Sequence, residues 1–115
     1  MSKDSGINYQ RGVITLVILS LLSQEDMYGY QLVQEMAQQS GGVLNTKEGS
    51  LYPILYKLLD QGYVSDKKVL VGRRMTRVYY HLEPQGKAYL QALTEEYRTV
   101  VQGVQGILER GEHNG

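Results

Sequence analysis

Cysteine, phenylalanine and tryptophan are all absent from the 115-residue sequence, and proline occurs only twice. Without cysteine the chain has no disulfide, no thiolate metal site and no cysteine nucleophile. The absence fits a reducing compartment. Tyrosine supplies every aromatic ring, ten in all, so the core must use tyrosine wherever it needs an aromatic side chain.

A long hydrophobic run is missing as well. The longest apolar stretch covers residues 13–22 and is interrupted by Thr15 and Ser20. This stretch is too short for a membrane span, which needs about 20 apolar residues. No small-residue cleavage site follows it, so a signal peptide is not expected either. The length and a hydrophobic content of 42% predict one packed domain, with the cytoplasm as its location and no membrane contact.

Net charge is zero, which taken alone argues against nucleic-acid binding. The distribution of charge argues in favour of it. Residues 57–87 contain seven lysines and arginines against three carboxylates, whereas the segments before and after are each acidic. Local charge decides whether a surface attracts phosphates, so the basic middle segment is a candidate DNA-contacting region.

The segment 47–59 has the pattern of a helix with one buried face. Its apolar residues follow the spacing i, i+3, i+4, i+7, i+8 and are Leu51, Ile54, Leu55, Leu58 and Leu59. The other face carries hydrogen-bond donors, namely Lys47, Ser50, Tyr52, Tyr56 and Lys57. Such a face suits a nucleic-acid surface. Thr46 is the predicted N-cap, with Ser50 as an alternative, and Pro53 predicts a bent first turn.

The order of the remaining elements predicts a winged helix. Helices are expected at about 8–23 and 28–39, strands at 63–71 and 75–82 with a basic tip between them, and a long helix from Pro84. The predicted fold class is mainly α with a two-stranded β wing. We expect a winged helix-turn-helix domain over residues 8–83 and a C-terminal dimerisation helix over 84–111.

The last helix carries an apolar seam with a spacing of three and four residues. Its members are Leu90, Leu93, Tyr97, Val100, Val104 and Ile107. This is a heptad a/d pattern over about three heptads. A monomer would leave the seam exposed, so we predict a homodimer.

These segments together resemble the PadR family of bacterial transcriptional regulators. The matching motifs are YGYQL at 28–32, GSLYPIL at 49–55, QGYV at 61–64 and YYHL at 79–82. The single C-terminal helix looks like the small subfamily. The resemblance implies a dimeric, double-stranded-DNA-binding regulator, usually a repressor, that binds a pseudo-palindromic operator and in some members is released by an aromatic ligand.

The resemblance and the helix pattern together nominate site residues. The predicted DNA-binding set is Thr46, Lys47, Glu48, Gly49, Ser50, Tyr52, Tyr56, Arg73, Arg74 and Arg77. Some small-subfamily members place a tryptophan where this chain has Tyr97. A small aromatic effector is therefore predicted to bind near Leu93, Tyr97 and Val100, although Tyr97 could equally fill that space itself.

Other readings of the same residues stay open. Tyr52 and Tyr56 could be half-buried aromatics, and the arginines could form an ordinary solvated turn. A winged helix used only for protein–protein contacts is the alternative function. An enzyme is not predicted, because the sequence has no paired carboxylates or nucleophile–base set. No cofactor or metal site is predicted, because two isolated histidines make no ligand cluster.

Overall fold

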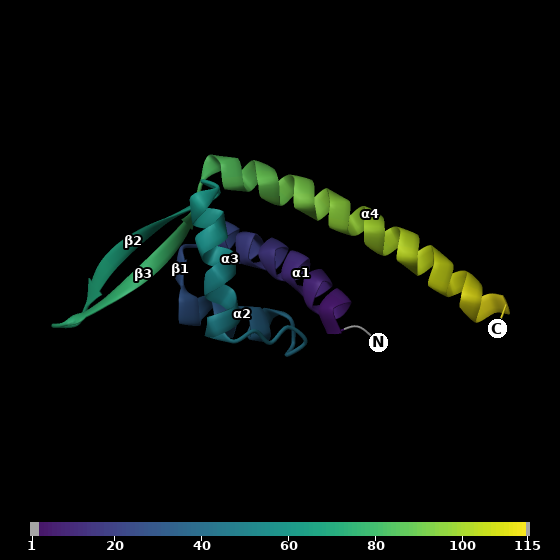
Figure 1. Ribbon diagram of the computed structural model, residues 1–115, viewed down its shortest axis with the longest axis horizontal. Helices are drawn as coiled ribbons and strands as arrows, with labels where there is room; N and C mark the ends of the chain where they lie inside the picture. The colour runs from purple at the N-terminus through teal and green to yellow at the C-terminus, as the bar shows by residue number, and fades with distance from the viewer. Residues whose placement is uncertain (1–2, 115) are drawn as a thin grey trace.

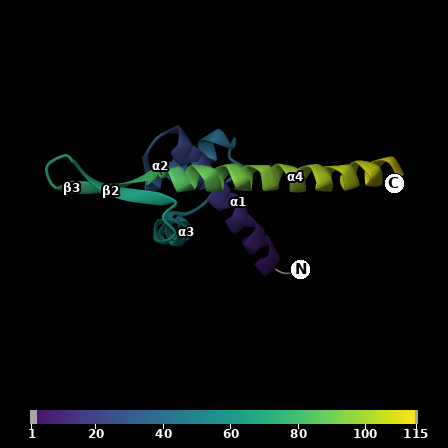
Figure 2. The ribbon, with the colours of Figure 1, turned by 90° about the horizontal axis from the view of Figure 1, so that it is seen from above.

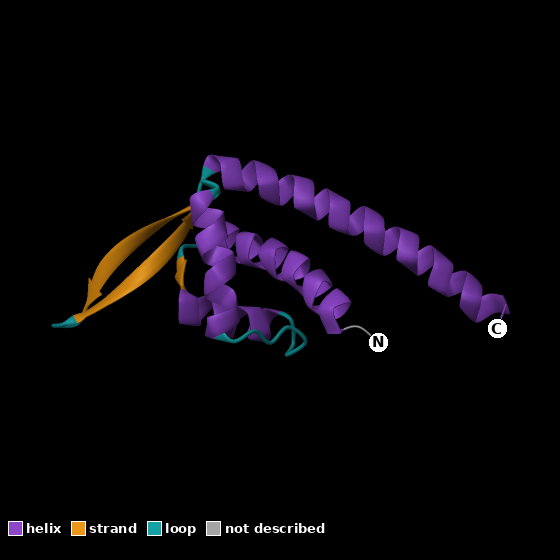
Figure 3. Ribbon diagram, viewed as in Figure 1, coloured by secondary structure: helices purple, strands orange, loops and turns teal. Residues whose placement is uncertain are grey.

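The computed structural model describes residues 3–114, with side chains placed from residue 12 onward. Helices dominate the architecture, and three strands form one small sheet (Figures 1 and 3). The elements in chain order are α1 Lys3–Gln24, β1 Met27–Tyr28, α2 Gly29–Gln39, α3 Glu48–Asp60, β2 Val64–Val71, β3 Met75–Leu82 and α4 Pro84–Asn114. This arrangement confirms the predicted winged helix with a long C-terminal helix.

The molecule is elongated, with principal extents of 64 × 27 × 24 Å. Helices α1, α2 and α3 form the central body, while the β2–β3 wing and α4 project from it in opposite directions (Figure 1). The view from above shows α3 end-on at one side of the molecule, away from α2 (Figure 2). The long dimension therefore comes from the wing and α4 rather than from the core.

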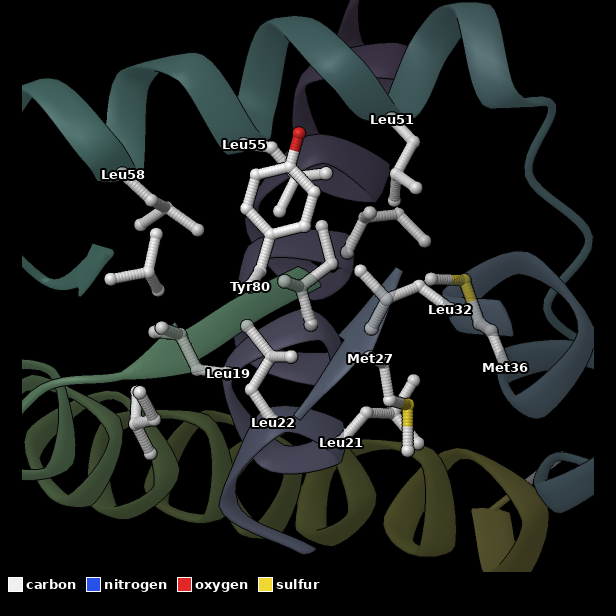
Figure 4. Close-up of a cluster of buried hydrophobic side chains, with 14 residues drawn as sticks. Leu19, Leu21, Leu22, Met27, Leu32, Met36, Leu51, Leu55, Leu58 and Tyr80 are labelled. Carbon is white, nitrogen blue, oxygen red and sulfur yellow. The ribbon is translucent and has the colours of Figure 1, made fainter. Parts of the chain in front are cut away.

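The core lies where α1, α2 and α3 meet the inner face of the sheet (Figure 4). Its fully buried side chains are Ile18, Leu19, Met27, Leu32, Met36, Leu51 and Leu55. Tyr80 from β3 is the aromatic of this core, and its hydroxyl points toward α3 (Figure 4). Each large apolar side chain stabilises the fold by about 1.5–3 kcal/mol through burial. The core therefore fixes α3 against the rest of the body through the face opposite its donors.

The sheet has the strand order β1-β3-β2, with both neighbouring pairs antiparallel. In β3 the predicted alternation is confirmed. Tyr80 and Leu82 are buried and Val78 is half-buried, whereas Arg77, Tyr79 and His81 lie on the other face. The two-residue strand β1 was missed, because a strand of that length has no periodicity that a sequence could reveal.

Several predicted boundaries were wrong. Helix α1 begins at Lys3 and not near residue 8, since no proline interrupts its backbone hydrogen bonding. Lys47 occupies the N-cap of α3 in place of Thr46 or Ser50, and no side chain caps that end. The carbonyl of Lys47 instead accepts bonds from the amides of Ser50 and Leu51, at 3.0 and 3.1 Å. Helix α3 is continuous across Pro53.

Candidate nucleic-acid interface

Helix α3 presents one exposed face to solvent, opposite the buried Leu51, Leu55 and Leu58. The exposed residues at its start and on this face are Lys47, Glu48, Gly49, Ser50, Pro53, Tyr56 and Lys57. The first amides of any helix lack intrahelical partners and favour anions. A helix that is packed on one face and carries hydrogen-bond donors on its exposed face is suited to enter a DNA groove.

Tyr52 lies at the edge of that face and is half-buried. Its hydroxyl donates a hydrogen bond of 3.0 Å to Oε2 of Glu48, one turn earlier. The ring covers Gly29 at the start of α2, where a Cβ would overlap the Tyr52 hydroxyl. Burial, and then the bond to Glu48, raise the pKa of Tyr52 above its usual value of 10.0. The phenol is thus a fixed donor that stays protonated.

Tyr56 follows Tyr52 by one turn and is far more accessible. Its side chain is 59% exposed. The two rings stack with centroids 5.9 Å apart and an interplanar angle of 25°. Tyr56 can therefore offer its hydroxyl outward while Tyr52 supports the ring from the side.

The wing ends in a turn built around Gly72, whose φ of 74° favours glycine. Arg73 and Arg74 lie exposed at this tip. Arg77 differs from them, because its guanidinium lies 4.3 Å from the ring centroid of Tyr28 and is half-buried. The structure thus gives Arg77 a cation–π contact within the sheet.

Two exposed cations of the wing were not among the predicted site residues. Lys67 and Lys68 lie on opposite faces of β2, paired with Tyr79 and Val78 of β3. Their contribution to the positive charge of segment 57–87 was the only available signal. With Arg73 and Arg74 they are four exposed cations on the wing.

His81 pairs with Asp26 rather than with a metal. Its Nδ1 lies 2.7 Å from Oδ1 of Asp26, and both side chains are more than half exposed. Within residues 3–114 no cluster of three or more candidate metal ligands occurs. The contact ties β3 to the turn that precedes β1.

The predicted dimer seam is largely uncovered along α4. Leu90 and Leu93 pack against the core, whereas the later members are exposed: Tyr97 40%, Val100 50%, Val104 50% and Ile107 73%. A row of exposed apolar side chains this long on one helix is typical of an interaction surface. No helix in the described part of the chain is long and apolar enough to cross a membrane.

The structure therefore has a three-helix body, an exposed helix face and a basic wing, which define a winged-helix protein. The model of the transcriptional regulator PadR-like family matches residues 18–92 of this sequence. The chain belongs to that family. Its members are transcriptional regulators and not enzymes, which confirms both the predicted family and the predicted absence of catalysis.

Sequence relatives support the assignment. The transcriptional regulator Rv3488 of Mycobacterium tuberculosis is 32% identical over 91% of this chain and 92% of its own length. The negative transcriptional regulator PadR of Bacillus subtilis is 28% identical, and the match spans 68% of this chain but only 43% of that protein.

Solved structures show the same fold. A transcriptional regulator from Clostridium thermocellum superposes with a TM-score of 0.79 at 26% identity, covering 85% of this chain and 95% of that one. Bacillus subtilis PadR in complex with operator DNA gives a TM-score of 0.65 at 28% identity, covering 70% of this chain and 46% of that one. This fold is therefore found in a protein bound to operator DNA.

Proposed function

We propose that the chain is a homodimeric repressor of transcription that binds a pseudo-palindromic operator in the cytoplasm. The observation that carries the proposal is the exposed face of α3 together with the exposed arginines of the wing tip. The similarity to an operator-bound PadR and to a negative regulator supports it.

Each part of the interface receives a role in this proposal. Base edges would be read from the start of α3 by Lys47, Glu48, Gly49 and Ser50, with Thr46 at its margin. Phosphates would be held by the first helix amides and by Tyr56. Arg73 and Arg74 would contact the flanking backbone. Because the hydroxyl proton of Tyr52 and the guanidinium of Arg77 have partners within the fold, we assign these two residues supporting roles.

Dimerisation is proposed through the exposed seam of α4, which would place two recognition helices about a two-fold axis. This divides the chain at Pro84 into a DNA-binding part and a dimerisation part, in the manner of the small PadR subfamily. A two-fold protein reads two-fold DNA, with half-sites about one helical turn, ~10–10.5 base pairs, apart.

An aromatic effector is proposed at the dimer centre, where Tyr97 and its symmetry mate would meet beside Leu93 and Val100. Apolar walls with phenol edges suit flat aromatic compounds. Release of DNA requires that the ligand prefer a dimer with differently spaced recognition helices. Titration of planar aromatic compounds against wild type and Tyr97→Ala tests this, and binding unchanged by Tyr97→Ala would contradict it.

Selection of bound sequences from a random duplex pool tests the proposed function as a whole. We expect enrichment of an inverted repeat with the spacing given above. A pool that remains random after repeated rounds would instead favour a winged helix used for protein contacts.

A further inference from the structure

Glu48 is an acidic residue on a surface proposed to meet DNA. It is exposed at the first residue of α3. Among the described residues no lysine or arginine forms an ion pair with it, and its only hydrogen-bond partner is the Tyr52 hydroxyl on Oε2. The second carboxylate oxygen, Oε1, therefore remains available as an acceptor.

The carboxylate is held in place by a chain of contacts. Tyr52 donates to Glu48, lies against Gly29 and stacks on Tyr56. The contacts with Gly29 and Tyr56 limit the positions that the Tyr52 ring can take, and its hydroxyl donates to Glu48. Glu48 is thus preorganised before any ligand arrives.

A carboxylate near phosphates lowers affinity unless DNA supplies a hydrogen-bond donor. In the major groove the donors are the exocyclic amines of cytosine and adenine, N4 and N6. Adenine presents the acceptor N7 beside its amine, and guanine and thymine present acceptors at this edge. A carboxylate can only accept hydrogen bonds. It is therefore repelled by the acceptor atoms of adenine, guanine and thymine, whereas the edge of cytosine offers it the N4 donor.

We propose that Glu48 reads a cytosine in each half-site through its N4 amine, and that Tyr52 is the residue that positions the carboxylate for this contact. The inference rests on the proposed DNA binding and adds a base identity to it. It also makes Glu48 a specificity element that rejects other bases.

The test compares selections from one random duplex pool using wild type, Glu48→Gln and Tyr52→Phe. Wild type should prefer cytosine at one position of each half-site by roughly tenfold. Glu48→Gln should shift that position toward adenine, because glutamine can pair with both N6 and N7. Tyr52→Phe keeps the ring over Gly29 but removes the donor, so the cytosine preference should fall several-fold while the other positions keep theirs.

Tyr56→Phe is the matched control, since it removes a neighbouring phenol that has no bond to Glu48. It should weaken binding to all sequences equally. Thermal unfolding of each variant separates base preference from folding, because a merely structural role for Tyr52 would lower stability without changing the preferred base.

The outcomes separate this inference from the proposed function. If wild type enriches no sequence, the DNA-binding proposal fails and the inference with it. An enriched motif that is identical for wild type and Glu48→Gln would overturn the reading of cytosine while DNA binding stands. A change in Glu48→Gln but none in Tyr52→Phe would support the base contact and overturn the positioning role.

Discussion

Tyr63 and Tyr89 stack face to face, with ring centroids 4.3 Å apart and an interplanar angle of 12°. The first residue precedes β2 and the second lies in the second turn of α4, so the pair joins the wing to the long helix. Two hydrogen bonds reinforce this junction between the start of β2 and the start of α4. The Glu83 amide donates to the Tyr63 carbonyl at 3.1 Å, and the Ser65 hydroxyl donates to a Glu83 carboxylate oxygen at 2.6 Å.

Gly86→Ala should disrupt the junction between the start of β2 and the start of α4 and lower the stability of the fold. A Cβ at Gly86 would overlap the Tyr63 carbonyl oxygen, which is backbone and cannot rotate away. Overpacking of this kind costs about 1–3 kcal/mol of unfolding free energy. We expect a lower melting temperature by circular dichroism. Gly111→Ala in the same helix has open space around it and should cause no destabilisation; equal melting temperatures for the two variants would disprove the packing argument.

Val104→Glu should prevent dimerisation. Val104 is 50% exposed in the single chain, so a carboxylate there is tolerated in a monomer, whereas in the proposed interface it would be buried without a partner at a penalty of several kcal/mol. Sedimentation should give a dimer for wild type and a monomer for the variant. Gln102→Glu, an exposed position outside the seam, should stay dimeric. Wild-type protein that sediments as a monomer at micromolar concentration would rule out the dimer.

Alkaline pH should destabilise the fold through Tyr80. Burial raises the pKa of its hydroxyl from 10.0 to about 12. A raised folded-state pKa gives stability that is complete below pH 10 and is lost as pH rises toward about 12. Tyr80→Phe should therefore flatten the fall in unfolding free energy over this window, measured by urea denaturation. Tyr30→Phe, which removes the hydroxyl of an exposed tyrosine, is the matched control variant. An identical dependence of the unfolding free energy on pH for Tyr80→Phe and wild type would refute the role given to Tyr80.

The elements that could be predicted from the sequence are those whose apolar residues recur at a regular spacing. The stripe from Leu51 to Leu59 predicted helix α3, and the alternation of Val78, Tyr80 and Leu82 predicted the buried side of β3. Strand β1 was not predictable, because Met27 and Tyr28 become a strand only by pairing with Tyr80 and Tyr79 of β3.

The positions of the candidate site residues on α3 and the wing could be predicted from the sequence, but their contacts could not. Donors on α3 and arginines on the wing follow from sequence position. The spacing of Glu48 and Tyr52, four residues apart on α3, allows their hydrogen bond, but the position of the Tyr52 ring against Gly29 of α2 depends on a tertiary contact. The contact of Arg77 with Tyr28 likewise depends on the pairing of β1 with β3. Sequence spacing describes neighbours on one element and carries no such information.

The central claim, DNA binding by α3 and the wing, is tested most directly by the salt dependence of affinity for the selected duplex. Arg73→Ala combined with Arg74→Ala should weaken binding and reduce the slope of log affinity against log salt by up to ~0.9 for each phosphate that the wing no longer neutralises. Arg98→Ala combined with Arg110→Ala removes two exposed cations of α4 and should keep the wild-type slope. We predict a steep wild-type slope that only the wing variant diminishes. A wild-type affinity that does not change with salt, or a wing variant with full affinity and full slope, would contradict the account.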